Sequence, residues 1–144
     1  MSETKQEKKE RQYREDLLEG VPTINLAALF MPPIWGPAQG IWVTILFYPL
    51  WLFADNLFYA AYSNPSPLSI ILALVVAVGL AVGTIFFAKV SQPYALERAL
   101  AKGLSKEKYL KNQRIWAVAM ALIAIVMIAL ATYYNLIIRP TLGA

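Results

Sequence analysis

Asp55 is the acidic residue of this sequence that lies inside an apolar run, GIWVTILFYPLWLFADNLFYA, in which Pro49 precedes it and Asn56 follows it. A carboxylate within a membrane-spanning segment is a candidate ion or proton site, because a charge in hydrocarbon needs a specific partner. A helix that started at Gly40 would place Asp55 roughly 22 Å along its axis, near the far interface of a bilayer, where water reaches it. The pattern leaves two interpretations open, a hydrated interface carboxylate and a transport site.

The side chains that most often perform catalysis or hold metals are missing, because the chain has no Cys and no His. Thiolate nucleophiles, cysteine-ligated metals and the commonest general base are thereby excluded. The sequence also lacks a Gly-rich phosphate loop, the HExxH and GxSxG motifs and a paired-carboxylate site. We therefore expect no catalytic residue, no metal or cofactor site and no enzyme activity.

The composition is typical of a membrane protein. Of the 144 residues, 58% are hydrophobic and 15% are charged, whereas soluble domains have about 45–50% and about 25%. The charges gather in residues 3–19 and 89–114 and leave long, nearly uncharged stretches between them. The net charge of +4 comes from basic residues that flank these stretches and form no nucleic-acid motif. We expect an all-α integral membrane protein that contacts the lipid bilayer and no nucleic acid.

The apolar stretches set the number of membrane crossings. Residues 68–88 and 115–138 are each long enough to cross ~30 Å of hydrocarbon as a helix. The first apolar block, residues 24–62, is too long for one crossing and barely long enough for two. Basic residues favour the cytoplasmic side, so the N-terminal arm and residues 89–114 should lie on that side together. Two segments on the same side of a membrane are joined by an even number of crossings, so the first block should cross only once. The sequence therefore predicts three spans, at about 40–60, 68–88 and 115–138, with the N-terminus in and the C-terminus out.

The predicted domains are a charged cytoplasmic N-terminal arm, residues 1–22, and a membrane domain, residues 23–144. Helix-forming residues fill the arm, and Glu7 and Arg11 have the favourable i,i+4 spacing for an ion pair. Gly20 is a stop signal. The arm is therefore expected to be a solvated charged helix.

Residues 24–39 form a Pro/Trp-rich segment that precedes the first span. Its prolines are Pro32, Pro33 and Pro37. Proline removes an amide donor and biases the preceding residue to extended backbone, so we expect a broken, partly buried segment at the interface. Backbone groups freed in this way cannot face lipid. The segment should pack against protein or headgroup water, with Asn25 and Gln39 as side-chain partners for these groups.

Small residues mark candidate helix contacts. Gly79 and Gly83 form a GxxxG motif in the second span, and such motifs let two helices approach closely. The small residues of the third span recur on one face: Ala117, Ala121 and Ala124. These residues could serve packing of the second span on the third or a homodimer contact. Pro49 should also produce a modest kink in the middle of the first span.

The basic segment, residues 89–114, is expected to be a cytoplasmic loop of two helical pieces. The first piece should close at Gly103, and the second should start at an N-cap, Ser105, and run into the third span. Four basic residues are expected at the lipid headgroups: Lys106, Lys108, Lys111 and Arg114. Cations near an anionic surface anchor a protein and fix its topology without a specific lipid site.

Two stretches carry a resemblance to a known family: INLAALFMPPIWG, and ERALAKGLSKEKYLKNQRIWAVAMAL before the last span. Over residues 24–122 the chain resembles a group of small prokaryotic three-span membrane proteins of unknown function, with an Asn-x-Ala-Ala-x-Phe-x-Pro-x-x-Trp type motif. Leu26 stands where that pattern favours Trp or Phe. The resemblance implies three spans in a prokaryotic plasma membrane and no known activity. The signature positions are Asn25, Pro32, Pro33, Trp35, Gly36, Gln113 and Trp116.

The sequence favours a function by association, because three spans without buried polar residues cannot readily line an aqueous path in one copy. We expect an accessory, assembly or regulatory subunit of a larger membrane complex, or a homo-oligomer. The alternative is an oligomeric small channel or transporter component that uses Asp55, Asn56 and Pro49.

Overall fold

The computed structural model describes residues 2–143, and its order of elements is all-helical over that part of the chain. The helices are α1 (Lys5–Leu18), α2 (Leu26–Phe30), α3 (Pro32–Ala38), the 3-10 helix η1 (Trp42–Leu46), α4 (Phe47–Ser63), α5 (Pro67–Ala101), α6 (Lys106–Tyr133), the π-helix η2 (Tyr134–Ile138) and α7 (Arg139–Thr141). Residues 1 and 144, where the predicted domains begin and end, lie outside the described part. The predicted all-α class is confirmed.

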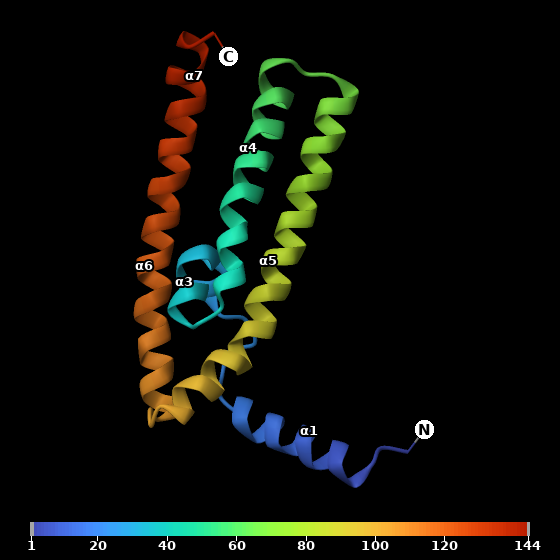
Figure 1. Ribbon diagram of the computed structural model, residues 1–144, viewed down its shortest axis with the longest axis vertical. Helices are drawn as coiled ribbons and strands as arrows, with labels where there is room; N and C mark the ends of the chain where they lie inside the picture. The colour runs from blue at the N-terminus through green and yellow to red at the C-terminus, as the bar shows by residue number, and fades with distance from the viewer. Residues whose placement is uncertain (1, 144) are drawn as a thin grey trace.

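Three helical stretches are long and apolar enough to cross a membrane: Trp42–Ser63, Pro67–Ala101 and Lys106–Thr141. In Figure 1, α4, α5 and α6 run along the long axis of the molecule, and α1 projects sideways at the end where α5 and α6 connect. Large apolar side chains such as Leu74, Val118 and Ile128 are exposed along these helices. Exposed apolar surface of this extent is stable only against lipid or another protein, so the chain is a membrane protein with three candidate spans.

The Pro/Trp-rich segment folds back into the molecule as two short helices. Asn25 caps α2, and the chain breaks at Met31 before α3 begins with Pro32 and Pro33. Proline is well suited to the first turn of a helix, where its missing amide has no intrahelical partner. The segment is broken and buried against protein, as predicted, but Pro32 and Pro33 start a helix and do not interrupt one.

This segment supplies the centre of the core. α2 packs against both α5 and α6, and α3 lies between α6 and α4 in Figure 1. Trp35 and Ala27 are fully buried there, beside Ala88 and Leu96 of α5. Small residues on α2 and α5 let the short helix approach the long one closely. The bulky Trp35 of α3 packs edge to face against Phe87 of α5, with 6.1 Å between the ring centres.

Two glycines permit close contacts around α3. A Cβ on Gly36 would overlap the side chain of Thr44 in η1, and a Cβ on Gly40 would overlap the guanidinium of Arg98 in α5. Gly40 also has a φ of +82°, in the left-handed region that glycine adopts without strain. The turn after α3 therefore depends on glycine at both positions.

Two expectations about the long helices are wrong. Pro49 lies in the first turn of α4, directly after η1, and so does not interrupt the middle of a continuous helix as expected. The basic segment, residues 89–114, is not a separate loop, because α5 continues through Pro93 to Ala101. Figure 1 shows α5 bending in its lower part, and a proline inside a helix is an ordinary cause of such a bend. Only residues 102–105 connect α5 to α6, with the predicted Ser105 N-cap in place.

The arm forms the predicted helix α1. Thr4 and Glu7 make a capping box, and hydrogen bonds from the backbone and the hydroxyl of Thr4 lower the pKa of Glu7. The expected Glu7 and Arg11 ion pair is not found, because Arg11 pairs with Glu3 at 3.1 Å and with Glu15 at 3.9 Å.

Candidate functional site

A cluster of amide side chains joins the Pro/Trp-rich segment to the two longest helices. We call it the amide cluster: Asn25 from the start of α2, Gln92 from α5 and Gln113 from α6, with Trp35 and Tyr109 bonded to it. Asn25 is 2% exposed and Gln92 is 3% exposed. The N-cap position of Asn25 fixes its side chain, because Oδ1 accepts a hydrogen bond of 3.0 Å from the amide of Ala28.

Asn25 uses its remaining side-chain donors to bind both neighbouring helices. Its Nδ2 donates to Oε1 of Gln92 and to Oε1 of Gln113, each at 2.9 Å. Its backbone amide donates to the carbonyl of Ala88 at 3.1 Å. Asn25 therefore ties α2 to α5 and α6 at one point.

The two glutamines receive second bonds from aromatic side chains. The hydroxyl of Tyr109 donates to Oε1 of Gln92 at 2.7 Å, and Nε1 of Trp35 donates to Oε1 of Gln113 at 2.9 Å. Nε2 of Gln92 donates to the carbonyl of Pro22 at 3.0 Å. The cluster is neutral and its members bind one another, so it acts as a structural clamp in a region of low dielectric, where such bonds are strong.

Sequence reasoning identified part of this cluster. Asn25, Trp35 and Gln113 are signature positions that the structure brings together, whereas Gln92 and Tyr109 were missed. The signal for Gln92 was a lone amide on the face of α5 that carries Ala88, Ala95 and Ala99, all of them buried. A polar residue amid small residues on a buried face needs a polar partner.

The other signature positions surround the cluster. Pro32, Pro33 and Gly36 are buried in α3 and shape the backbone there. Trp116 is half-buried and makes no hydrogen bond within residues 2–143; it lines a cavity near the ends of α3 and α5. Gln39 joins the turn through its carbonyl, which accepts from Arg98, and not through its side chain as expected.

A second polar cluster joins α4 to the C-terminal part of the chain. Asn135 donates to Asp55 at 2.7 Å, and Arg139 donates to Asn56 at 2.7 Å and to Asn135 at 3.2 Å. The guanidinium of Arg139 also lies 4.0 Å from the ring centre of Tyr59, in cation–π contact. The π-helix η2 contains Asn135. Asp55 is half-buried and bonded within the chain.

The predicted small-residue contact between the second and third spans is not found in this chain. Gly79 and Gly83 are exposed on α5, and a Cβ at either would have nothing within 4 Å. The alanines of α6 are half-buried: Ala117, Ala121 and Ala124. Ala117 and Ala124 pack against the core that the Pro/Trp-rich segment supplies. The short helix α2 thus takes the place on α6 that α5 was expected to occupy.

The four predicted headgroup cations differ in their surroundings. Nζ of Lys106 donates to the carbonyls of Glu19 at 2.9 Å and Asp16 at 3.3 Å, so it binds the end of the arm. A cation at a helix C-terminus also offsets the negative end of the helix dipole. Lys108, Lys111 and Arg114 are exposed.

Comparisons of the chain with protein-family models, with curated proteins and with solved structures find no match. The family resemblance therefore stays a prediction, and the function has to be argued from the geometry.

Proposed function

We propose that this chain is a small integral membrane subunit that acts by association, as an accessory, assembly or regulatory component of a larger membrane complex. One observation carries this proposal. The polar side chains that could do chemistry bind one another inside the molecule, whereas the surfaces of α4, α5 and α6 are apolar and exposed. Large exposed apolar surfaces mark places where a protein contacts a partner or the membrane.

The proposed location is the plasma membrane of a prokaryote, with the N-terminus inside. Lys108, Lys111 and Arg114 are exposed in the first part of α6. This helix begins at the end of the molecule from which α1 projects (Figure 1). The positive-inside rule favours the cytoplasmic side for this end.

The exposed face of α5 that contains Gly79 and Gly83 is the proposed contact surface. No other part of residues 2–143 approaches these glycines within 4 Å of an added Cβ. Glycine in a helix interior costs about 1 kcal/mol relative to alanine. Two exposed glycines at this spacing are consistent with a helix that packs on them from outside the chain.

The alternative function is an oligomeric channel or transporter component. In this chain Asp55 and Asn56 bind Asn135 and Arg139, which supports a structural role for them. One variant, Asp55→Asn, distinguishes the two proposals. Asp55→Asn should abolish a measurable flux if Asp55 is a transport site, and should leave association unchanged if the chain is a subunit.

The test is co-purification of tagged variants from native membranes in mild detergent. Gly79 and Gly83 are exposed, and an added Cβ at either meets nothing within 4 Å. We therefore expect Gly79→Leu and Gly83→Leu to keep the stability of the fold while they block a helix contact from outside. We expect both variants to lose most of the bound partner. Ala129→Leu, on the exposed surface of α6, is the control and should retain it. Equal retention by all three variants would contradict the assignment of this face.

A further inference from the structure

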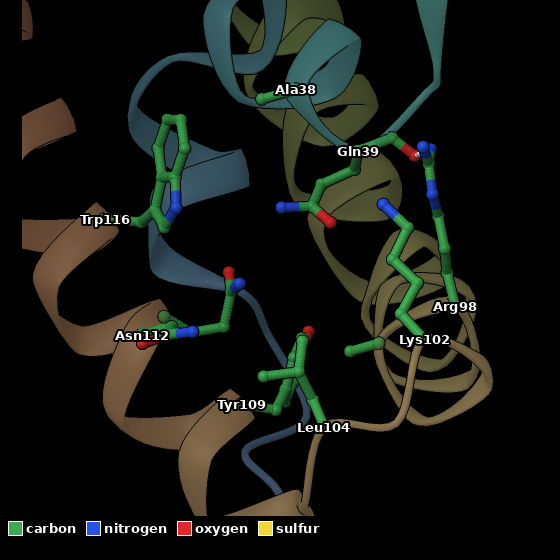
Figure 2. Close-up of a pocket in the computed structure, with 10 residues that line it drawn as sticks. Ala38, Gln39, Arg98, Lys102, Leu104, Tyr109, Asn112 and Trp116 are labelled. Atoms are coloured by element: carbon green, nitrogen blue, oxygen red, sulfur yellow. Dashed lines mark hydrogen bonds between the residues drawn. The ribbon is translucent and has the colours of Figure 1, made fainter.

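A cavity of about 210 Å³ lies where the ends of α3 and α5 meet the start of α6. Its lining includes Gln39 from the turn after α3, Arg98 and Lys102 from the end of α5, and Asn112, Gln113 and Trp116 from α6. Figure 2 shows the side chains of Lys102, Gln39 and Asn112 around this space, with Tyr109 and Leu104 below them. The proposed contact surface around Gly79 and Gly83 does not include this cavity, so the cavity has no role in the proposed function.

The charge of this cavity is positive. Arg98 and Lys102 line it, and no carboxylate does. Neither side chain forms an ion pair with any residue in the range 2–143, where the ion pairs belong to Arg11. The carboxyl-terminal ends of α3 and α5 contribute about half a negative charge each. A net positive charge remains after this correction.

Arg98 is held in place, whereas Lys102 is free to move. The guanidinium of Arg98 donates to the carbonyl of Gln39 and lies against Gly40. Lys102 is exposed and its amino group has no hydrogen-bond partner in the described part of the chain. A guanidinium has five donors in a fixed arrangement, so one bond to a carbonyl leaves others for a ligand.

Neutral donors complete the lining. Oε1 of Gln113 accepts from Asn25 and Trp35, which leaves its NH₂ group without a partner among residues 2–143. The side chain of Asn112 is likewise unbonded there and lies beside the cavity in Figure 2. Guanidinium, ammonium and amide NH₂ groups all donate hydrogen bonds, and phosphate oxygens accept them. At about 210 Å³ the space is many times larger than the ~15 Å³ that one water needs, which leaves room for a phosphate group with some water.

We propose that this cavity binds a phosphate group, carried by the headgroup of an anionic membrane lipid. The cavity lies at the basic end of the molecule, where Lys108, Lys111 and Arg114 are exposed. Basic pockets between membrane helices at such an end are suited to anionic headgroups. A lipid is favoured over free phosphate because the apolar surfaces of α5 and α6 beside the cavity can contact its acyl chains.

The test is native mass spectrometry of the purified full-length chain with phosphatidylglycerol or phosphatidylcholine of the same acyl chains. Lys102→Gln and the pair Arg98→Gln/Lys102→Gln remove cavity charges. Lys108→Gln/Lys111→Gln is the control, because it changes the net charge as much as the double variant but touches only exposed residues of α6. The side chain of Lys102 is exposed and has no hydrogen-bond partner among residues 2–143, so the Lys102→Gln variant keeps the test valid if Arg98→Gln destabilises the turn.

We expect the wild type to bind phosphatidylglycerol in preference to phosphatidylcholine. The affinity for phosphatidylglycerol should fall about tenfold in Lys102→Gln and further in the double variant. In the control variant this affinity should fall by less than about twofold, if the headgroup binds in the cavity and is not held by the overall charge of the protein. Equal losses in the control, or no preference for the anionic lipid, would overturn the proposal. Saturable binding of inorganic phosphate that depends on Lys102, without any gain from the lipid, would overturn its assignment to a lipid.

Discussion

At the scale of residues, Asn25 bonds through every polar atom of its side chain. Oδ1 caps α2, and the two donors of Nδ2 reach Gln92 and Gln113 on different helices. These partners lie 67 and 88 positions away in the sequence. The sequence identified this amide as a partner for freed backbone groups. Its role as N-cap and its glutamine partners depend on where α2 begins and how it packs, which no local pattern specifies.

Replacing Asn25 by Ala should destabilise the folded chain by about 2–4 kcal/mol, because α2 loses its cap, Gln92 loses a buried hydrogen bond and Gln113 loses a part-buried one. Thermal unfolding in detergent, followed by circular dichroism, measures this. The matched control is Asn112→Ala, which removes an amide without a hydrogen bond in residues 2–143 and should change stability by less than about 0.5 kcal/mol. Equal stability of the two variants would rule out the clamp.

Two glycine-to-alanine substitutions should have opposite effects. Gly36→Ala places a methyl group against Thr44 and should cost about 1–3 kcal/mol through overpacking. Gly83→Ala has nothing within 4 Å and should be neutral or stabilising by up to about 1 kcal/mol. The same unfolding measurement compares them. A neutral Gly36→Ala would show that η1 does not lie close to α3.

At the scale of elements, the sequence predicted where the long apolar helices lie but not the residues at which they end. Length and hydropathy locate α5 and α6 because twenty or so apolar residues have few alternatives to a spanning helix. Residues 89–114 were expected to form a separate loop after the second span, but α5 continues through Pro93 to Ala101, and Ala95 and Leu96 on this part of the helix are buried in the core. Tertiary packing here overrides a local signal, as it does where α2 and α3 fold between the spans.

The contact between α4 and the C-terminal segment gives an element-scale prediction. Asp55→Ala removes the acceptor for Asn135 and should speed hydrogen exchange of the amides in residues 134–141 by about tenfold. Asp55→Asn keeps an acceptor oxygen at the same place, so its exchange should change by less than about threefold. Mass spectrometry of the exchanged protein measures both. Unchanged exchange in Asp55→Ala would mean that this bond does not hold the segment.

At the scale of the whole molecule, the topology can be tested directly because the chain has no Cys. Single cysteines at Ser2, Ser66, Gly103 and Leu142 would report in turn on the arm, the two connections between spans and the C-terminal end. With the proposed orientation, an impermeant thiol reagent added outside intact cells should label Ser66→Cys and Leu142→Cys alone. Labelling of Ser2→Cys from outside would invert the proposed topology.

The composition predicted the class of the molecule, a membrane protein, but it did not predict the core that α2 and α3 form between the long helices. Charge segregation predicted a membrane protein with three spans, and the structure has three helices long and apolar enough for that role. The core made by α2 and α3 was beyond prediction because its contacts join residues such as Asn25 and Gln113 across most of the chain. The proposed function by association rests on the exposed apolar surfaces of α4, α5 and α6.

The most direct measurement is the native mass of the wild-type protein extracted from its own membranes in mild detergent at native expression level. Function as an accessory, assembly or regulatory subunit predicts a stoichiometric complex in which the chain is bound to a larger membrane protein. A complex of copies of this chain alone would favour the oligomeric channel or transporter instead. A mass equal to one chain with bound lipid and detergent, in every mild detergent tried, would contradict the account.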